Sequence, residues 1–150
     1  MRRLSIALLA LLAACGSDAP ETSNTMDAAT DGASSSVPRA IRIVSPTEGA
    51  EVMGPDVTVE LEATGIEIVP AGDTASGTGH HHLYLDADLA PMGEPIPSVP
   101  GQIIHMGDGS SAYTFEGLEP GEHRIIAVVG DGVHVPVQPP MVDTVRFVVR

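Results

Sequence analysis

From residue 39 onward, short runs of alternating hydrophobic and polar residues are separated by Gly and Pro. The clearest run is at 57–63, VTVELEA, in which every second residue is hydrophobic. A period of two is typical of a β-strand with one buried face. The residues from 39 onward therefore predict β-structure.

Other hydrophobic runs between Gly and Pro residues predict further strands at 40–44, 65–69, 81–87, 103–106, 112–115, 122–129 and 142–149. The segment 122–129 is hydrophobic on both faces beyond Arg124, which indicates a central strand. The predicted strands are short, follow one another along the whole domain and are separated by turn residues. This arrangement predicts an all-β, antiparallel immunoglobulin-like β-sandwich. Residues 39–150 are enough for one such domain, and outside the first 14 residues no helical period is present.

The N-terminal pattern is different. Residues 1–14, MRRLSIALLALLAA, place two arginines before a hydrophobic stretch that is too short to span a bilayer, and Cys15 follows at once. This layout resembles the lipobox of bacterial lipoproteins, which implies that 1–14 is a signal peptide, that the chain is cleaved before Cys15 and that Cys15 is acylated. Gly16, rather than Asp, follows the cysteine, a pattern similar to that of outer-membrane lipoproteins. We therefore expect a lipid anchor in the outer membrane, facing the periplasm.

Residues 15–38 contain many Ser, Thr, Ala, Asp and Gly and have no hydrophobic period. Such a stretch cannot bury enough surface to offset the entropy of ordering it. We expect a lipidated cysteine followed by a flexible, disordered tether that joins the membrane to the domain.

Charge and missing motifs exclude several functions. The chain has 7 basic and 20 acidic residues and a formal net charge of -13, so no nucleic-acid partner is expected. Its one cysteine is Cys15, and no Gly-x-Ser-x-Gly motif is present, so no enzymatic nucleophile is visible. We predict that the protein is not an enzyme.

The histidines are the most specific chemical feature. All six lie in one part of the domain: His80, His81, His82, His105, His123 and His134. On a strand His80 and His82 share a face, and imidazole is the commonest protein ligand of transition metals.

The metal hypothesis uses four of these histidines. His80 and His82 form its central pair, and His105 and His134 complete a copper or zinc site. Met106 is an outer candidate, and with Met141 it would supply the soft ligands that favour copper. The alternative is that the histidines are structural, hydrogen-bonded within the fold, with His123 bracing the turn at Leu118–Gly121.

Five blocks resemble a known family. They are GHHHLYLD at 79–86, EPIP at 94–97, HMGDG at 105–109, LEPGEH at 118–123 and GDGVHVP at 130–136, with Pro139-Pro140 after them. In this order they resemble DUF4399, a family of small secreted or lipid-anchored bacterial domains of unknown function. The resemblance covers roughly Val57 to Val149 and includes every histidine.

Together these features predict a lipid-anchored binding module of the cell envelope that binds copper or zinc through a histidine cluster. The alternative function is a non-catalytic module that binds an envelope protein or a glycan, or has a structural role.

Overall fold

The computed structural model describes residues 37–150. This part of the chain forms nine strands and contains no helix long and apolar enough to cross a membrane. The strands are β1 (Ala40–Ser45), β2 (Ala50–Val52), β3 (Val57–Thr64), β4 (Glu67–Ile68), β5 (Thr78–Leu85), β6 (Ile103–Met106), β7 (Ala112–Phe115), β8 (Gly121–Gly130) and β9 (Val142–Val149). The predicted signal peptide, Cys15 and nearly all of the predicted tether lie outside the described residues.

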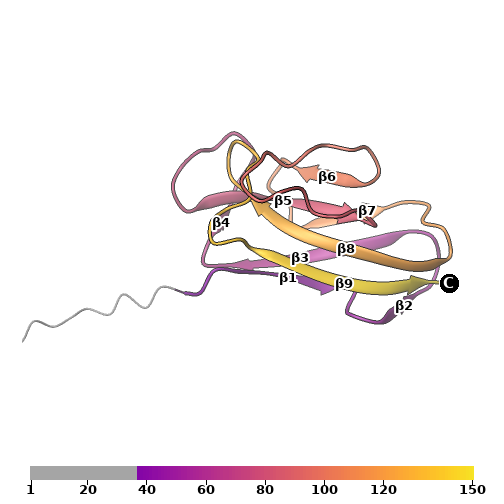
Figure 1. Ribbon diagram of the computed structural model, residues 1–150. Helices are drawn as coiled ribbons and strands as arrows, with labels where there is room; N and C mark the ends of the chain where they lie inside the picture. Colours follow the sequence, from indigo (N-terminus) through magenta and orange to yellow (C-terminus); the bar gives the residue numbers. More distant parts are fainter. Residues whose placement is uncertain (1–36) are drawn as a thin grey trace, which may run out of the picture. The chain divides into compact units, whose positions relative to one another are not determined.

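The strands form two sheets that face each other (Figure 1). The smaller sheet has the order β1-β3-β7, and the larger has the order β2-β9-β8-β5-β4, with β6 also paired to β5. The prediction of an all-β, immunoglobulin-like sandwich is confirmed, and β8 is a central strand as its hydrophobic character indicates.

The predicted strands at 103–106, 112–115 and 142–149 match the structure to the residue. Several details differ from the prediction. The strand predicted at 65–69 is reduced to Glu67–Ile68. The strand that carries the histidine triplet begins earlier, at Thr78, and ends at Leu85. The sequence gives no sign of β2, since three residues are too short to show a period, and β2 and β4 pair in parallel with β9 and β5. The sandwich is therefore antiparallel except at these two short strands.

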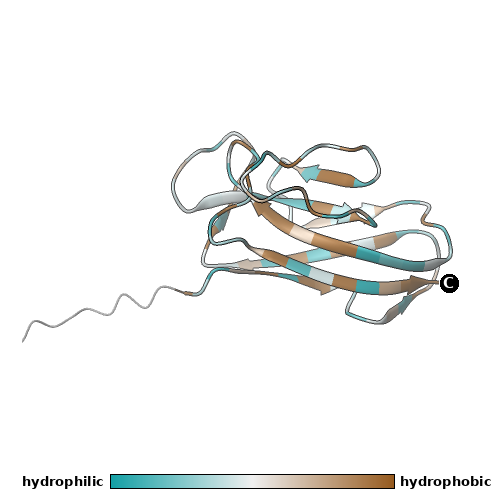
Figure 2. Cartoon of the chain, in the orientation of Figure 1, coloured by the Kyte–Doolittle hydropathy of each residue, from teal (hydrophilic) through white to brown (hydrophobic). Residues whose placement is uncertain are grey.

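Strand β5 has a hydrophobic cluster on each side, because its residues alternate between faces. Leu83 and Leu85 belong to the main core between the two sheets, with Ile125 and Phe147. Tyr84 belongs to a second, smaller cluster on the outer face of the larger sheet. Figure 2 shows hydrophobic residues along both β5 and β8. This two-sided burial is why the whole of β5 from Gly79 to Leu85 is buried.

The outer cluster is covered by the segment that connects β5 to β6. Ile96 and Val99 of this segment pack near Ile103 of β6 and Val128 of β8. The connection thus forms a partial third layer over one end of the larger sheet (Figure 1). His80 and His82 of β5 lie on the face of the sheet that this layer covers.

Candidate metal centre

The alternation of β5 divides the histidine triplet between its two faces. His82 is the cross-strand partner of His105, and His81 is the partner of Met106. His80 and His82 therefore share the outer face with His105, whereas His81 faces the core. Each histidine of the triplet is only 1% exposed. The central pair of the predicted metal site is therefore buried.

Four imidazole rings converge on the outer face: those of His80, His82, His105 and His134. The Nε2 atoms of His80 and His82 lie 2.9 Å apart, and those of His105 and His134 lie 3.1 Å apart. Every pair of the four rings has a centroid separation between 4.6 and 5.7 Å. Ligand atoms of His80, His82 and His105 all lie within 4.8 Å of one another. The structure brings together all four histidines that the sequence singled out.

A hydrogen-bonded loop after β8 positions His134. Its φ is +68°, an uncommon conformation for a residue other than glycine. Asp131 holds the loop, because its Oδ1 accepts hydrogen bonds from the backbone N–H groups of Val133 and Val135. The backbone N–H of Ile96 donates to the His134 carbonyl at 2.8 Å, which ties the loop to the third layer. Strained backbone of this kind is concentrated at functional sites.

Two glycines provide the space for the rings. A Cβ atom at Gly107 would lie 2.4 Å from Cε1 of the His105 ring. A Cβ at Gly130 would lie 2.9 Å from Nε2 of His82. Any larger residue at either position would push an imidazole out of the cluster.

The four rings have no hydrogen-bond partner outside the cluster among the described residues. Nδ1 of His82 is buried and has no partner at all. A structural histidine looks different, as His123 shows. Its Nδ1 lies 2.7 Å from Asp86 Oδ2 and its Nε2 lies 2.8 Å from the Glu119 carbonyl oxygen.

The cluster favours neutral imidazoles. Burial, with repulsion from His105 and His134, lowers the pKa of His80 to about 4. Burial, with repulsion from His80, lowers the pKa of His82 to about 3, and burial also lowers the pKa of His105. At neutral pH the rings of His80, His82 and His105 are therefore uncharged, which is the form of imidazole that binds a metal ion.

Met106, the outer candidate ligand, is not part of this site. Its side chain is 3% exposed and packs in the main core. Because His105 and Met106 are successive residues of β6, their side chains point to opposite faces. Met141 lies in the same core cluster, so the four-histidine site has nitrogen ligands and no thioether.

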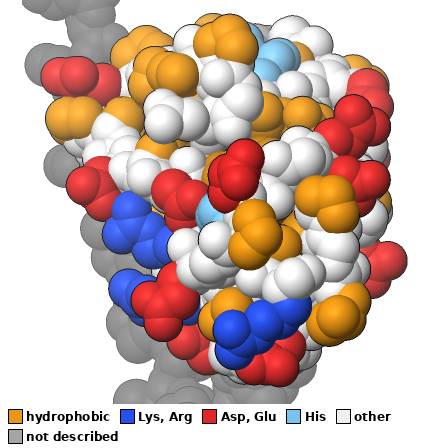
Figure 3. All heavy atoms as spheres, turned by 90° about the vertical axis from the view of Figure 1, so that its right-hand side faces the viewer, with side chains coloured by type: hydrophobic (Ala, Val, Ile, Leu, Met, Phe, Trp, Pro, Cys, Tyr) orange, Lys and Arg blue, Asp and Glu red, His pale blue; other side chains and the backbone are white. Residues whose placement is uncertain are grey.

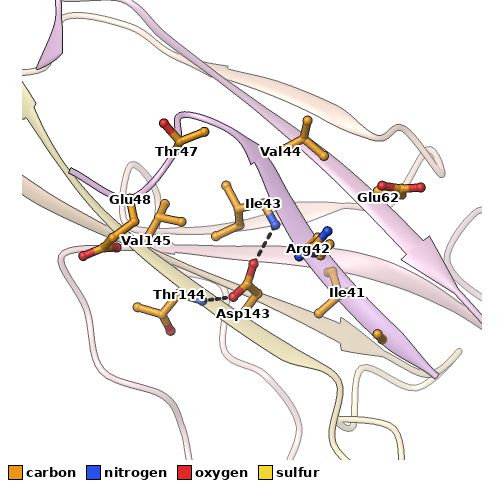
Figure 4. Close-up of a pocket in the computed structure, with 11 residues that line it drawn as sticks. Ile41, Arg42, Ile43, Val44, Thr47, Glu48, Glu62, Asp143, Thr144 and Val145 are labelled. Atoms are coloured by element: carbon orange, nitrogen blue, oxygen red, sulfur yellow. Dashed lines mark hydrogen bonds between the residues drawn. The ribbon is translucent and has the colours of Figure 1, made fainter. Parts of the chain in front are cut away.

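Charge does not mark the site. In Figure 3 acidic side chains are spread over the visible face, and histidine side chains reach its surface in two places. A cleft of about 650 Å³ lies elsewhere, between β1 and β9 (Figure 4). Asp143 projects into this cleft and accepts a hydrogen bond from the backbone N–H of Ile43 at 2.8 Å. That carboxylate thus occupies part of the gap between the two strands.

A comparison with protein families agrees with the motifs of the sequence. Residues 59–150 match the model described as "Domain of unknown function (DUF4399)". The chain belongs to the DUF4399 family. The matched region includes every histidine of the cluster, so the candidate metal centre is part of the DUF4399 domain.

Comparisons with individual proteins add little. No curated protein matches. Among solved structures, an engineered protein from a structural genomics programme is similar at 11% identity and a TM-score of 0.42, over 75% of this chain and 20% of its own. The extracellular domain of a protein assigned as a one component system from B. thetaiotaomicron is similar at 10% identity and a TM-score of 0.40, over 76% of this chain and 15% of its own. This chain thus spans a fifth or less of the solved chains.

Sequence patterns alone did not identify the residues that support the DUF4399 site. Gly107, Gly130 and Asp131 are not among the four proposed ligands. The two glycines leave space for the imidazole rings, and Asp131 fixes the His134 loop. Their position in the sequence could have indicated this role, since each lies inside a motif block that also contains a histidine.

Proposed function

We propose that the DUF4399 domain binds one Cu(II) or Zn(II) ion through His80, His82, His105 and His134. The observation that carries the proposal is that, among the described residues, these four rings form hydrogen bonds only with one another. Buried imidazoles that serve a structural role hydrogen-bond to the surrounding protein, as His123 does. A metal ion would replace the two ring-to-ring hydrogen bonds and bind a lone pair of each of the four rings.

The nitrogen distance within each of the two histidine pairs is close to the value that such an ion needs. With metal–nitrogen bonds of about 2.0–2.1 Å, ligand nitrogens of a tetrahedral site lie roughly 3.4 Å apart. The Nε2 separations of 2.9 and 3.1 Å are a few tenths of an ångström shorter than this value. Small rotations of the rings would therefore admit an ion between the two pairs.

The ligand chemistry limits the ion. Imidazole nitrogens suit Cu(II) and Zn(II), while Mg²⁺ and Ca²⁺ require oxygen ligands. The two buried rings of β5 form the fixed half of the site, and His105 and His134 form the more accessible half. With four ligands from the protein, a tetrahedral ion keeps no open position for a substrate, which favours binding over catalysis.

The N-terminal motif supports the setting of this function. We place the domain in the cell envelope, tethered through acylated Cys15 to the outer membrane and facing the periplasm. There it would buffer copper or zinc or transfer the ion to a partner. Cys15→Ser should abolish acylation and release the protein from membranes. Continued membrane attachment of this variant would contradict the anchor but would leave the metal site untouched.

Calorimetric titration of the full-length protein with Cu(II) and Zn(II) tests the metal site. We expect one ion per chain, bound more tightly than micromolar, and a large loss of affinity in the His105→Ala/His134→Ala variant. His123→Gln is the matched control, because it removes an imidazole outside the cluster and should bind normally. If neither ion binds more tightly than micromolar, the histidines are structural, and a module that binds an envelope protein or a glycan becomes the better account.

A further inference from the structure

His81 faces the main core and leaves one nitrogen without a partner. Its Nδ1 lies 3.0 Å from the carbonyl oxygen of Ser110. A carbonyl oxygen can only accept, so Nδ1 carries the proton and Nε2 carries the lone pair. Nε2 is buried and has no hydrogen-bond partner. Buried polar atoms are rarely left in this state, so the lone pair calls for an explanation.

The neighbouring side chains cannot supply a hydrogen bond. On β5 the cross-strand partners of His81 are Met106 of β6 and Val129 of β8. Side chains at directly opposed positions on one face have Cβ atoms about 5 Å apart, so the Met106 thioether lies within reach of the imidazole. A thioether has no hydrogen to donate, and the Val129 side chain is hydrocarbon. The imidazole therefore shares this part of the core with a second electron-pair donor.

Nε2 of His81 and the sulfur of Met106 each have a lone pair and no hydrogen, so neither can donate a hydrogen bond to the other. Both can bind a metal ion. Thioether sulfur combined with imidazole selects soft monovalent ions, Cu(I) above all. The hydrogen bond from Nδ1 to Ser110 resembles the contacts that orient metal-binding histidines. We propose that His81 Nε2 and the Met106 thioether form a second metal site, which binds a soft monovalent cation such as Cu(I).

The position of the pair permits access. His81 and Met106 are 1% and 3% exposed. Ser110, which holds the His81 ring, is only half-buried and lies in the turn between β6 and β7. The turn that holds the His81 ring therefore reaches the surface, and a local opening of that turn would admit an ion.

This site does not depend on the four-histidine site, because the two lie on opposite faces of β5. The outer face offers four nitrogens, which suit divalent ions, and the inner face offers nitrogen and sulfur. Successive residues of one strand would thus hold the two oxidation states of copper in separate places.

Silver(I), a soft monovalent ion that has no stable divalent state in water, is the probe for this proposal. The full-length protein, labelled in its methionine methyl groups, is titrated with Ag(I) and followed by NMR. We expect the Met106 methyl resonance to shift as one equivalent is added, while those of Met53 and Met92, which are 80% and 44% exposed, stay in place. Met106→Leu, which preserves volume, should abolish this binding, and Met53→Leu should not alter it.

The same titration on the His105→Ala/His134→Ala background separates the two proposals. The Met106 shift should persist there, even though Cu(II) and Zn(II) binding is lost. An unmoved Met106 resonance at excess Ag(I), or equal Ag(I) affinity in Met106→Leu, would overturn the second site and would indicate that an internal water satisfies His81. Neither result would affect the four-histidine site.

Discussion

The Nε2 atoms of His105 and His134 lie 3.1 Å apart, although 29 residues separate them and His134 lies in a loop. His105 is exposed and His134 is half-buried, whereas His80 and His82 are almost completely buried. The cluster therefore has a rigid half on a central strand and an accessible half at the surface. The accessible half can be altered without damage to the core, which makes the site testable.

Removal of the His134 ring should weaken metal binding and leave the fold intact. Loss of a residue that merely orients a ligand typically costs about 10–100-fold in metal affinity, so loss of a ligand should cost at least ~100-fold. Competition with a chelator of known affinity measures the change for His134→Ala. Val133→Ala, at the neighbouring exposed position, is the control. Equal affinity in the two variants would remove His134 from the ligand set.

Gly107→Ala should weaken metal binding although it removes none of the four histidine ligands. Its new Cβ would collide with the His105 ring and displace this ring from the cluster. A double-mutant cycle isolates the cause, because Gly107→Ala should have no further effect on the His105→Ala background. Additive losses of affinity would show that the glycine acts by another route.

Acid should destabilise the metal-free protein through the buried rings. The folded-state pKa values of His80 and His82 are about 4 and about 3, while an unfolded histidine titrates near 6.5. Between these values the unfolded chain binds more protons, so this stability is complete above pH 6.5 and is lost as the pH falls toward 4. The expected slope is about 1.4 kcal/mol per pH unit for each ring.

Urea unfolding in the presence of a chelator, between pH 7 and pH 5, measures this slope. His82→Leu should make the stability less dependent on pH than in the wild type. The comparison of the two proteins cancels the titration of the many carboxylates, which both share. An unchanged slope in His82→Leu would mean that the ring is protonated in the folded protein.

The pair of His123 and Asp86 should show the opposite pH dependence. Burial lowers the pKa of His123, but hydrogen bonds to the Glu119 carbonyl and the Asp86 carboxylate outweigh it, and the net pKa is raised. Its contribution to stability is therefore complete below pH 6.5 and is lost as the pH rises through the folded pKa.

Asp86→Asn tests this pair, since asparagine tolerates the positive φ of +50° at this position. We expect the substitution to cost about 1 kcal/mol of unfolding free energy at pH 6 and less at pH 9. NMR titration of the His123 ring should show its pKa fall in the variant. A cost that is the same at both pH values would contradict the charged pair.

The sequence predicted the sandwich well because its strands show their burial directly. Alternation at 57–63 corresponds to β3, the middle strand of the smaller sheet, which buries one face, and two-sided hydrophobicity at 122–129 corresponds to β8, an inner strand of the larger sheet. Strand β2 could not be predicted, since Ala50–Val52 is held in the sheet by pairing with β9 and has no hydrophobic pattern of its own. Strand propensity is weak where tertiary contacts decide.

For the candidate site, alternation predicted that His80 and His82 share a face. It could not predict their burial, because the covering layer is an irregular segment whose path has no period. For Met106, alternation along the strand predicted at 103–106 is already enough to separate it from His105, since successive residues of a strand face opposite sides. The loop that brings His134 to His105 depends on hydrogen bonds to Asp131, which become visible only in the folded structure.

X-ray absorption spectroscopy of the full-length protein loaded with one equivalent of Zn(II) tests the central claim most directly. The account predicts four nitrogen ligands at about 2.0–2.1 Å, with the outer-shell scattering of four imidazoles. The His105→Ala/His134→Ala variant should lose the pattern. A zinc ion surrounded mainly by water or carboxylate oxygen, with fewer than three imidazoles, would contradict the four-histidine site.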